Sequence, residues 1–176
     1  MRFLRKLYLR WANWFGTQLR GRPAEHKGGL TYDTRELAAS ELVARFIYSR
    51  SKMSKQQGRP KPGAFDPSPY NKLSVAHSTG LQDLDVWEIG RLTLGTQPGR
   101  EKIHGRADIP VKSLVDSKLS AMRDDNPFKR HTSVIGWPES ADSDERKQLW
   151  LDICLALSQD PDVKLVIPET PIIRSV

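Results

Sequence analysis

Residues 103–138, IHGRADIPVKSLVDSKLSAMRDDNPFKRHTSVIGWP, carry the pattern that decides the fold. Two short apolar runs, each typical of a strand, flank a short helical pattern. Each run opens on a cationic, hydrogen-bonding cluster, made of His104, Arg106 and Asp108 in the first run and of Lys129, Arg130 and His131 in the second. We expect any chemical site of this protein to lie in this stretch.

The rest of the chain mixes strand and helix patterns. Strands are predicted over residues 44–49, 73–78 and 163–167. Helices are predicted from about residue 33, from residue 79 and over residues 144–158, and the second of these would end just before Gly90. The last helix is apolar nearly all round, which predicts burial on most of its circumference. Residues 50–69 have the composition of a long loop.

These elements do not alternate regularly as β-α-β units, so we expect an α+β fold. The expected architecture is a small mixed sheet packed against two or three helices. Residues 1–22 would form a basic amphipathic helix, and residues 31–176 a single α+β domain, since 176 residues usually make one core. The five tryptophans favour a folded chain over a disordered one.

Composition excludes several classes of protein. The single cysteine, Cys154, excludes an internal disulfide and a cysteine-rich zinc site. The sequence has no glycine-rich phosphate loop and no metal-binding motif, so we expect no cofactor and no metal. No stretch of the sequence approaches the roughly 18–20 consecutive apolar residues that are needed to span a bilayer. A cytoplasmic location, in a bacterial or phage-like setting, is the expectation.

The net charge of +7 is concentrated at the N-terminal end. Residues 1–60 carry 13 Lys/Arg against 4 Asp/Glu, whereas residues 139–176 carry 4 against 8. Such asymmetry is typical of a basic surface that binds an anionic partner. The predicted phosphate contacts come from the N-terminal segment and from the 50–61 loop. They are Arg2, Arg5, Lys6, Arg10, Arg20, Arg22, Arg50, Lys52, Lys55, Arg59 and Lys61.

The N-terminal helix has an aromatic side opposite its cationic stripe. The aromatic residues predicted to stack on bases or to pack on a partner are Trp11, Trp14, Phe15 and Tyr48. Nucleic acid would use the cationic stripe, another protein would use the aromatic side, and an anionic membrane surface would use both. A helix that packs on its own domain is a further alternative, and an Arg-rich, acid-poor start also matches an organelle transit peptide, although this segment is not Ser-rich. We favour nucleic acid or a nucleoprotein complex, and a membrane least.

His131 is the histidine that we single out for chemistry. It opens a predicted strand, HTSVIG, beside Lys129 and Arg130, and a histidine among cations is suited to proton transfer on a phosphate ester. An ordinary edge-strand histidine is the alternative. Arg106 and Asp108 alternate onto one side of their strand, where they would either hold a phosphate or form a structural ion pair.

Two short motifs, His77-Ser-Thr79 and His131-Thr-Ser133, resemble the paired H-x-[ST] motifs of the two-histidine phosphoesterases. The resemblance covers six residues and departs from the family's hydrophobic alternation around each motif. It implies a small α+β fold with two related lobes and the cleavage or formation of phosphate bonds in RNA, with one histidine as acid and the other as base. Arg106 and Arg130 would assist at such a site.

Three functions are therefore compatible with the sequence. The first is a small basic binding module that engages nucleic acid or a nucleoprotein complex. The alternative is an RNA-directed phosphoesterase or nuclease-like enzyme that uses His131 with His77. A protein-complex subunit that docks through its N-terminal helix is a third kind of function. The first two are separated by whether the two histidines face one pocket.

Overall fold

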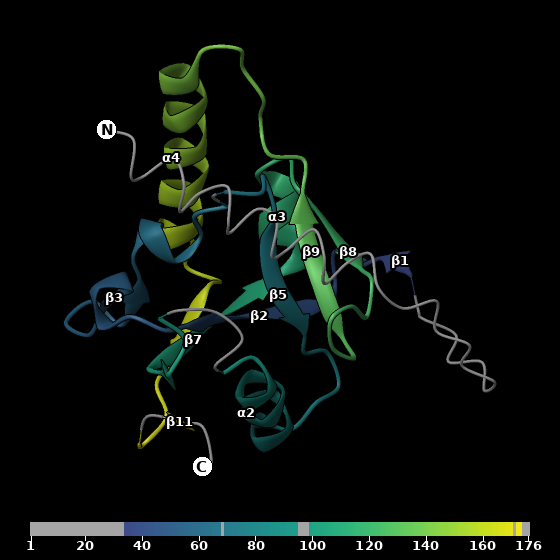
Figure 1. Cartoon of the computed structure of the whole chain (residues 1–176), viewed down its shortest axis with the longest axis vertical. Coiled ribbons are helices and arrows are strands. Elements are labelled where there is room, and N and C mark those ends of the chain that lie inside the picture. The colour runs from purple at the N-terminus through teal and green to yellow at the C-terminus, as the bar shows by residue number, and fades with distance from the viewer. Residues whose placement is uncertain (1–33, 68, 95–98, 171, 174–176) are drawn as a thin grey trace, which may run out of the picture. The chain divides into compact units, whose positions relative to one another are not determined.

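The computed structural model describes residues 34–67, 69–94, 99–170 and 172–173. These residues belong to a compact unit, Tyr32–Val176, and residues 1–31 form a second unit that lies outside the described residues. The predicted N-terminal helix and its aromatic and basic contacts therefore lie outside the described residues as well. The unit Tyr32–Val176 is built on one large sheet with helices around it (Figure 1).

The sheet has seven strands in the order β1-β8-β9-β5-β2-β7-β10. Its strands are β1 (Arg35–Glu36), β2 (Leu42–Ile47), β5 (Leu73–His77), β7 (Gly105–Pro110), β8 (Ser120–Arg123), β9 (His131–Ile135) and β10 (Lys164–Val166). All of its strand pairs are antiparallel. The α+β class is confirmed, but the expected small mixed sheet is wrong, because the sheet is large and purely antiparallel.

Two small two-stranded ladders accompany the main sheet. One pairs β3 (Met53–Ser54) with β4 (Arg59–Pro60), and the other pairs β6 (Lys102–Ile103) with β11 (Ile172–Ile173). Short 3-10 helices, η1 (Arg50–Lys52) and η2 (Pro62–Ala64), flank the first ladder. The expected loop over residues 50–69 is therefore largely an ordered hairpin with helical turns at its ends.

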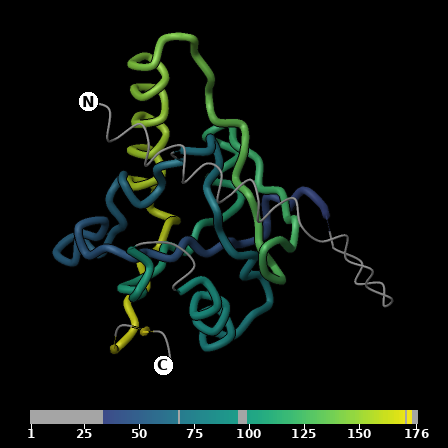
Figure 2. Tube along the Cα trace, viewed as in Figure 1, coloured from purple at the N-terminus to yellow at the C-terminus, as the bar shows by residue number. Residues whose placement is uncertain are grey.

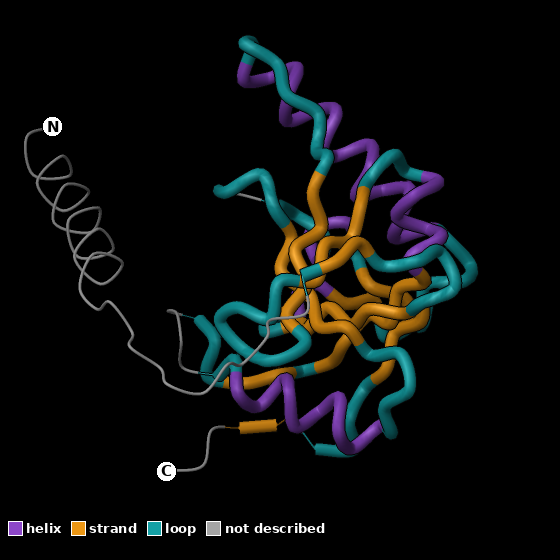
Figure 3. The backbone as a smooth tube through the Cα atoms, turned by 90° about the vertical axis from the view of Figure 1, so that its right-hand side faces the viewer, coloured by secondary structure: helices purple, strands orange, loops and turns teal. Residues whose placement is uncertain are grey.

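Helices cover both faces of the sheet (Figure 3). Helix α4 (Ser143–Gln159) and helix α3 (Val111–Asp116) pack on one side, which we call the α4 face, in a core that includes Val43 and Val75. Helix α2 (Asp83–Leu92) packs on the other side, the α2 face, with Phe46 and Ala76. Strand alternation sends neighbouring residues to opposite faces, so each strand contributes to both cores.

Helix α4 begins where the sequence predicts it. The Asp142 carboxylate accepts hydrogen bonds from the Asp144 and Glu145 amides at 2.7 and 3.1 Å, which caps the first turn. The link from Gly136 to Asp142 carries the chain away from β9 to the far end of this helix, and the helix runs back towards the sheet (Figure 2).

The predicted burial of α4 on most of its circumference is wrong. Trp150, Cys154 and Leu157 are buried, but Leu151 is 51% exposed and Leu155 is 42% exposed. One sheet face can cover only one side of a helix, and the structure places no second layer over the opposite side among its described residues. Apolar content alone therefore overestimated the burial of this helix.

The structure also tests the five remaining predicted elements, three strands and two helices. The strands at 44–49, 73–78 and 163–167 are confirmed as β2, β5 and β10 within a few residues. The helix predicted from residue 33 is wrong, since Arg35 and Glu36 pair with β8 and the Glu41 amide closes a turn on the Ala38 carbonyl at 2.9 Å. Gly90 lies inside α2, where Phe46 Cε1 stands 2.7 Å from the position of a Cβ.

No helix among the described residues is both long enough and apolar enough to cross a membrane.

Candidate functional site

A cavity of about 410 Å³ opens on the α2 face beside the C-terminal end of α2. Its polar walls include the cations Arg45, Lys72 and Arg100 and the acid Asp66. Tyr70 and Phe128 supply aromatic walls, and Ser74 and His131 also line it. Three cations against one acid make this cavity suited to an anionic ligand with a planar group.

Strands β2 and β5 contribute Arg45 and Ser74 to the cavity lining, next to the point where their short ladder ends. Only Val43–His77 and Ala44–Ala76 pair there, so the strands separate beyond Ala44. Arg45 replaces the missing ladder bonds: its Nη1 donates to the Ser74 carbonyl at 2.8 Å and its Nε to the Ala64 carbonyl at 3.1 Å. Burial lowers the pKa of Arg45 to about 10, which still leaves a cation at neutral pH.

Ser74, His131 and Asp124 form a hydrogen-bonded series at this cavity. The Ser74 hydroxyl lies 2.8 Å from His131 Nε2. On the other side of the ring, Nδ1 contacts Asp124 Oδ1. Asp124 Oδ2 accepts a further bond from the Ser133 hydroxyl at 2.9 Å. Because a carboxylate only accepts, we assign the proton to Nδ1, which leaves the Nε2 lone pair directed at the Ser74 hydroxyl.

The strand register explains why these residues meet. Ser74 pairs with Ser133 and Ala76 pairs with His131, so Ser74 and His131 are diagonal neighbours on the same face. Asp124 follows β8, and its amide donates to the His131 carbonyl at 3.1 Å. The Phe128 ring stands edge-on to the imidazole, with 5.0 Å between centroids. The imidazole is therefore held by contacts at both nitrogens and by an aromatic ring.

His77 lies on the opposite face. It follows Ala76 in β5, and it pairs with Val43 of the α4 face. Its Nε2 is 3.0 Å from Glu41 Oε1, without the geometry of a hydrogen bond, and its Nδ1 has no partner. Burial lowers the pKa of His77, against the opposing effect of Glu41. The structure therefore does not bring His77 and His131 to one pocket.

The two predicted arginines at the site have other partners. The Arg106 guanidinium contacts Asp83 and Asp108 and lies 4.5 Å from the Trp87 ring centroid. Arg106 is 5% exposed, so of the two predicted roles, holding a phosphate or forming a structural ion pair, the structure favours the ion pair. Arg130 donates to the carbonyls of His77 and Thr79 at 3.3 and 3.0 Å. Neither guanidinium lines the cavity.

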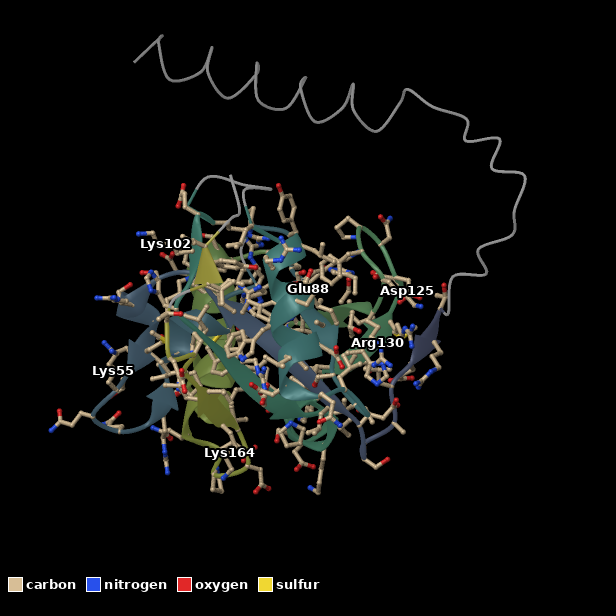
Figure 4. The ribbon with its side chains drawn as sticks, turned by 90° about the horizontal axis from the view of Figure 1, so that it is seen from below. Lys55, Glu88, Lys102, Asp125, Arg130 and Lys164 are labelled. Carbon is tan, nitrogen blue, oxygen red and sulfur yellow. The ribbon has the colours of Figure 1, made fainter. Side chains whose placement is uncertain are left out.

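A second cationic feature lies around His104. Burial lowers the pKa of His104, and the positive charges of Arg50, Lys102 and Lys55 lower it further, so each of these cations acts on the same imidazole. Lys55 and Lys102 lie on one side of the unit, and Asp125 and Arg130 on the other (Figure 4). Among the described residues, no ion pair links Arg50, Lys55 or Lys102 to an acid. We call these three residues the basic cluster.

The other residues predicted to contact nucleic acid are more dispersed. Lys52 is partly buried, and Arg59 Nη1 donates to the Gln159 carbonyl at 3.3 Å. Lys61 is exposed near that same end of α4. The Tyr48 hydroxyl bonds Thr93 Oγ1 at 2.6 Å, and Arg100 lies over its ring. Tyr48 is therefore engaged within the unit rather than free to stack on a base.

Sequence reasoning missed Ser74 and Asp124. Ser74 is 57 residues from His131, and nothing in LSVAH distinguishes it from any other strand serine. Asp124 is seven residues from His131, between the two predicted strands of the central stretch. No group of three or more potential metal ligands is present within the described ranges. Comparison with protein-family models, curated proteins and solved structures finds no match to this chain.

Proposed function

We propose that this protein is a small basic module that binds nucleic acid, alone or within a nucleoprotein complex. The observation that carries the proposal is the basic cluster, Arg50, Lys55 and Lys102. Cations without an acid partner keep their charge available to an external anion, and a polyphosphate backbone releases counterions when such cations bind it. The +9 charge of residues 1–60 extends the same preference, and the N-terminal segment would supply further contacts.

The cavity on the α2 face supports the same proposal independently. Its cationic wall suits a phosphate, and Tyr70, which is 60% exposed, offers a face on which a base stacks. Stacking on aromatic side chains contributes about 1–3 kcal/mol per base and tolerates any sequence. A single strand fits these features better than a duplex, because its bases are free to enter a cavity.

The experiment compares two triple variants that remove the same formal charge. The first is Arg50→Gln, Lys55→Gln and Lys102→Gln. The control is Arg91→Gln, Lys112→Gln and Lys147→Gln, three exposed cations that each pair with an acid three or four residues away. We expect the first variant to reduce the slope of log K against log salt by about 2–3 for single-stranded oligonucleotides, and the control to change it by less than about 1.

Deletion of residues 1–22 tests the contribution of the N-terminal segment in the same assay. Loss of salt-dependent binding would place phosphate contacts there. An unchanged salt slope in both the deletion and the cluster variant contradicts nucleic-acid binding. It would favour a protein partner for the aromatic residues of this segment instead.

An RNA-directed phosphoesterase remains the second candidate function. His131 lines the cavity, which favours it. The form in which His77 and His131 share one phosphate is not supported, because the two side chains project from opposite faces of the sheet.

A further inference from the structure

We propose that the cavity is a catalytic site in which Ser74 is the nucleophile, His131 the general base and acid, and Asp124 the residue that positions His131. Its substrate class is the phosphodiester of a nucleic-acid strand. The choice of a nucleic-acid substrate rests on the proposed function above. The serine relay itself rests only on the hydrogen-bonded series at the cavity.

The geometry meets the requirements of a nucleophile, a base and an orienting group. Ser74 Oγ and His131 Nε2 are 2.8 Å apart, within the range for proton transfer. Asp124 contacts the other ring nitrogen and is itself held by Ser133. The same roles recur on unrelated folds, so the relay is recognised by its geometry and not by its position in a chain.

The position of Ser74 also fits the role. Its side chain lines the cavity, while its carbonyl accepts from the half-buried Arg45 guanidinium. The cations in the wall, Lys72 and Arg100 among them, suit the charge that develops on a phosphoryl group under attack. A hydrogen-bonded series that served only to satisfy buried groups would need neither an open cavity nor a cationic wall.

The reaction would proceed in two balanced steps. Ser74 Oγ attacks phosphorus as its proton passes to His131 Nε2. The bond to the leaving oxygen breaks on the opposite side of phosphorus, and that oxygen takes a proton from a water molecule, which leaves hydroxide there. The hydroxide then attacks the phosphoserine from that side, the Oγ–phosphorus bond breaks, and Ser74 Oγ recovers its proton from Nε2. Water is the only co-reactant.

Covalent labelling tests the nucleophile without any nucleic acid. A dialkyl fluorophosphate forms an Oγ–phosphorus bond with an activated serine and releases fluoride. We expect the full chain to be labelled at Ser74, and His131→Asn to slow labelling by about 10²–10⁴-fold, the usual contribution of a general base. Ser120→Ala is the matched control, because Ser120 lies on the same face of the sheet and has no hydrogen bond to a histidine among the described residues.

Turnover of bis(4-nitrophenyl) phosphate tests the remaining roles. Ser74→Ala should abolish it. Asp124→Asn should lower kcat with KM unchanged, because Asp124 orients the imidazole and does not touch substrate. Lys72→Gln should raise KM instead. A thermal melt of each variant shows that it is folded.

The outcomes separate this proposal from the binding proposal. Absence of label at Ser74 in the folded wild-type protein, or equal labelling of His131→Asn, overturns the relay. Labelling with cleavage of both RNA and DNA strands supports the whole proposal. Labelling without strand cleavage keeps the relay and overturns the nucleic-acid substrate. Cleavage of RNA alone that survives Ser74→Ala overturns Ser74 as nucleophile, since the RNA 2′-hydroxyl would then attack.

Discussion

His131 and His77 lie on adjacent strands, one residue apart in register, yet their surroundings differ. The His131 ring has contacts at both nitrogens, from Ser74 and Asp124, and it borders an open cavity. His77 is buried on the α4 face, with one nitrogen near Glu41 and the other without a partner. A shift of one residue along a strand moves a side chain to the other face. That step alone places His131 at the cavity and His77 on the opposite face of the sheet.

His77 lies on the face of the sheet that α4 covers, and Trp150 packs α4 onto that face. Removing the Trp150 side chain should therefore have the largest effect on the surroundings of His77. Trp150→Ala should cost about 3–5 kcal/mol, as a large-to-small change at a side chain that is 9% exposed. Leu151→Ala, on the exposed side of the same helix, should stay within about 0.5 kcal/mol. Chemical denaturation measures both. Equal losses would show that the two sides of α4 pack alike.

On the face that bears His131, α2 packs so closely on Phe46 at Gly90 that a larger side chain does not fit there. Gly90→Ala would place a Cβ 2.7 Å from Phe46 Cε1, so we expect overpacking to cost about 1–3 kcal/mol. Gly63→Ala is the control, since a Cβ there meets no atom within 4 Å. A thermal melt of Gly90→Ala that matched the control would show that α2 moves freely over Phe46.

Replacing each histidine by leucine compares the two directly. His131→Leu leaves Ser74 and Asp124 without their partner, which should cost about 1–3 kcal/mol. His77→Leu removes a ring with no hydrogen bond of its own, so its cost should stay below about 1 kcal/mol. Urea unfolding at neutral pH gives both values. The reverse order would mean that the Glu41 contact stabilises His77 more than its geometry indicates.

The smallest effect concerns Glu41, the acid beside His77. Hydrogen bonds from the Arg35 guanidinium hold the pKa of Glu41 at about 2, below its usual 4.5. Stability from a carboxylate with a lowered pKa is present above pH 4.5 and is lost as the pH falls towards 2. Arg35 is partly exposed, so solvent reduces the effect to about 1 kcal/mol. The difference in unfolding free energy between wild type and Glu41→Gln should therefore close between pH 5 and pH 2.

His77 changes stability with pH in the same direction. Because its pKa is lowered from 6.5, the unfolded chain takes up the proton first, and stability falls as the pH drops below about 6.5. The double variant His77→Leu, Glu41→Gln removes both contributions to the pH dependence of stability. An acid limb that did not change in the double variant would assign acid unfolding to other carboxylates.

Several elements of this fold could be predicted from residues that are close together in the sequence. The Asp142 side chain starts α4 through bonds to amides two and three residues ahead, and the alternation in HTSVIG is enough to predict β9. The charge asymmetry of the chain is likewise a property of composition. Each of these depends on neighbours within one or two turns of chain, which is why a single sequence contains them.

The site was decided only by tertiary structure. Ser74 meets His131 across 57 residues because β5 and β9 pair in one particular register, and Asp124 meets it because the chain turns back after β8. The separation of β2 from β5, which lets Arg45 bond the Ser74 carbonyl, has no local signal either. Register between distant strands depends on the sum of all packing on both faces, and no single segment of the chain encodes that sum.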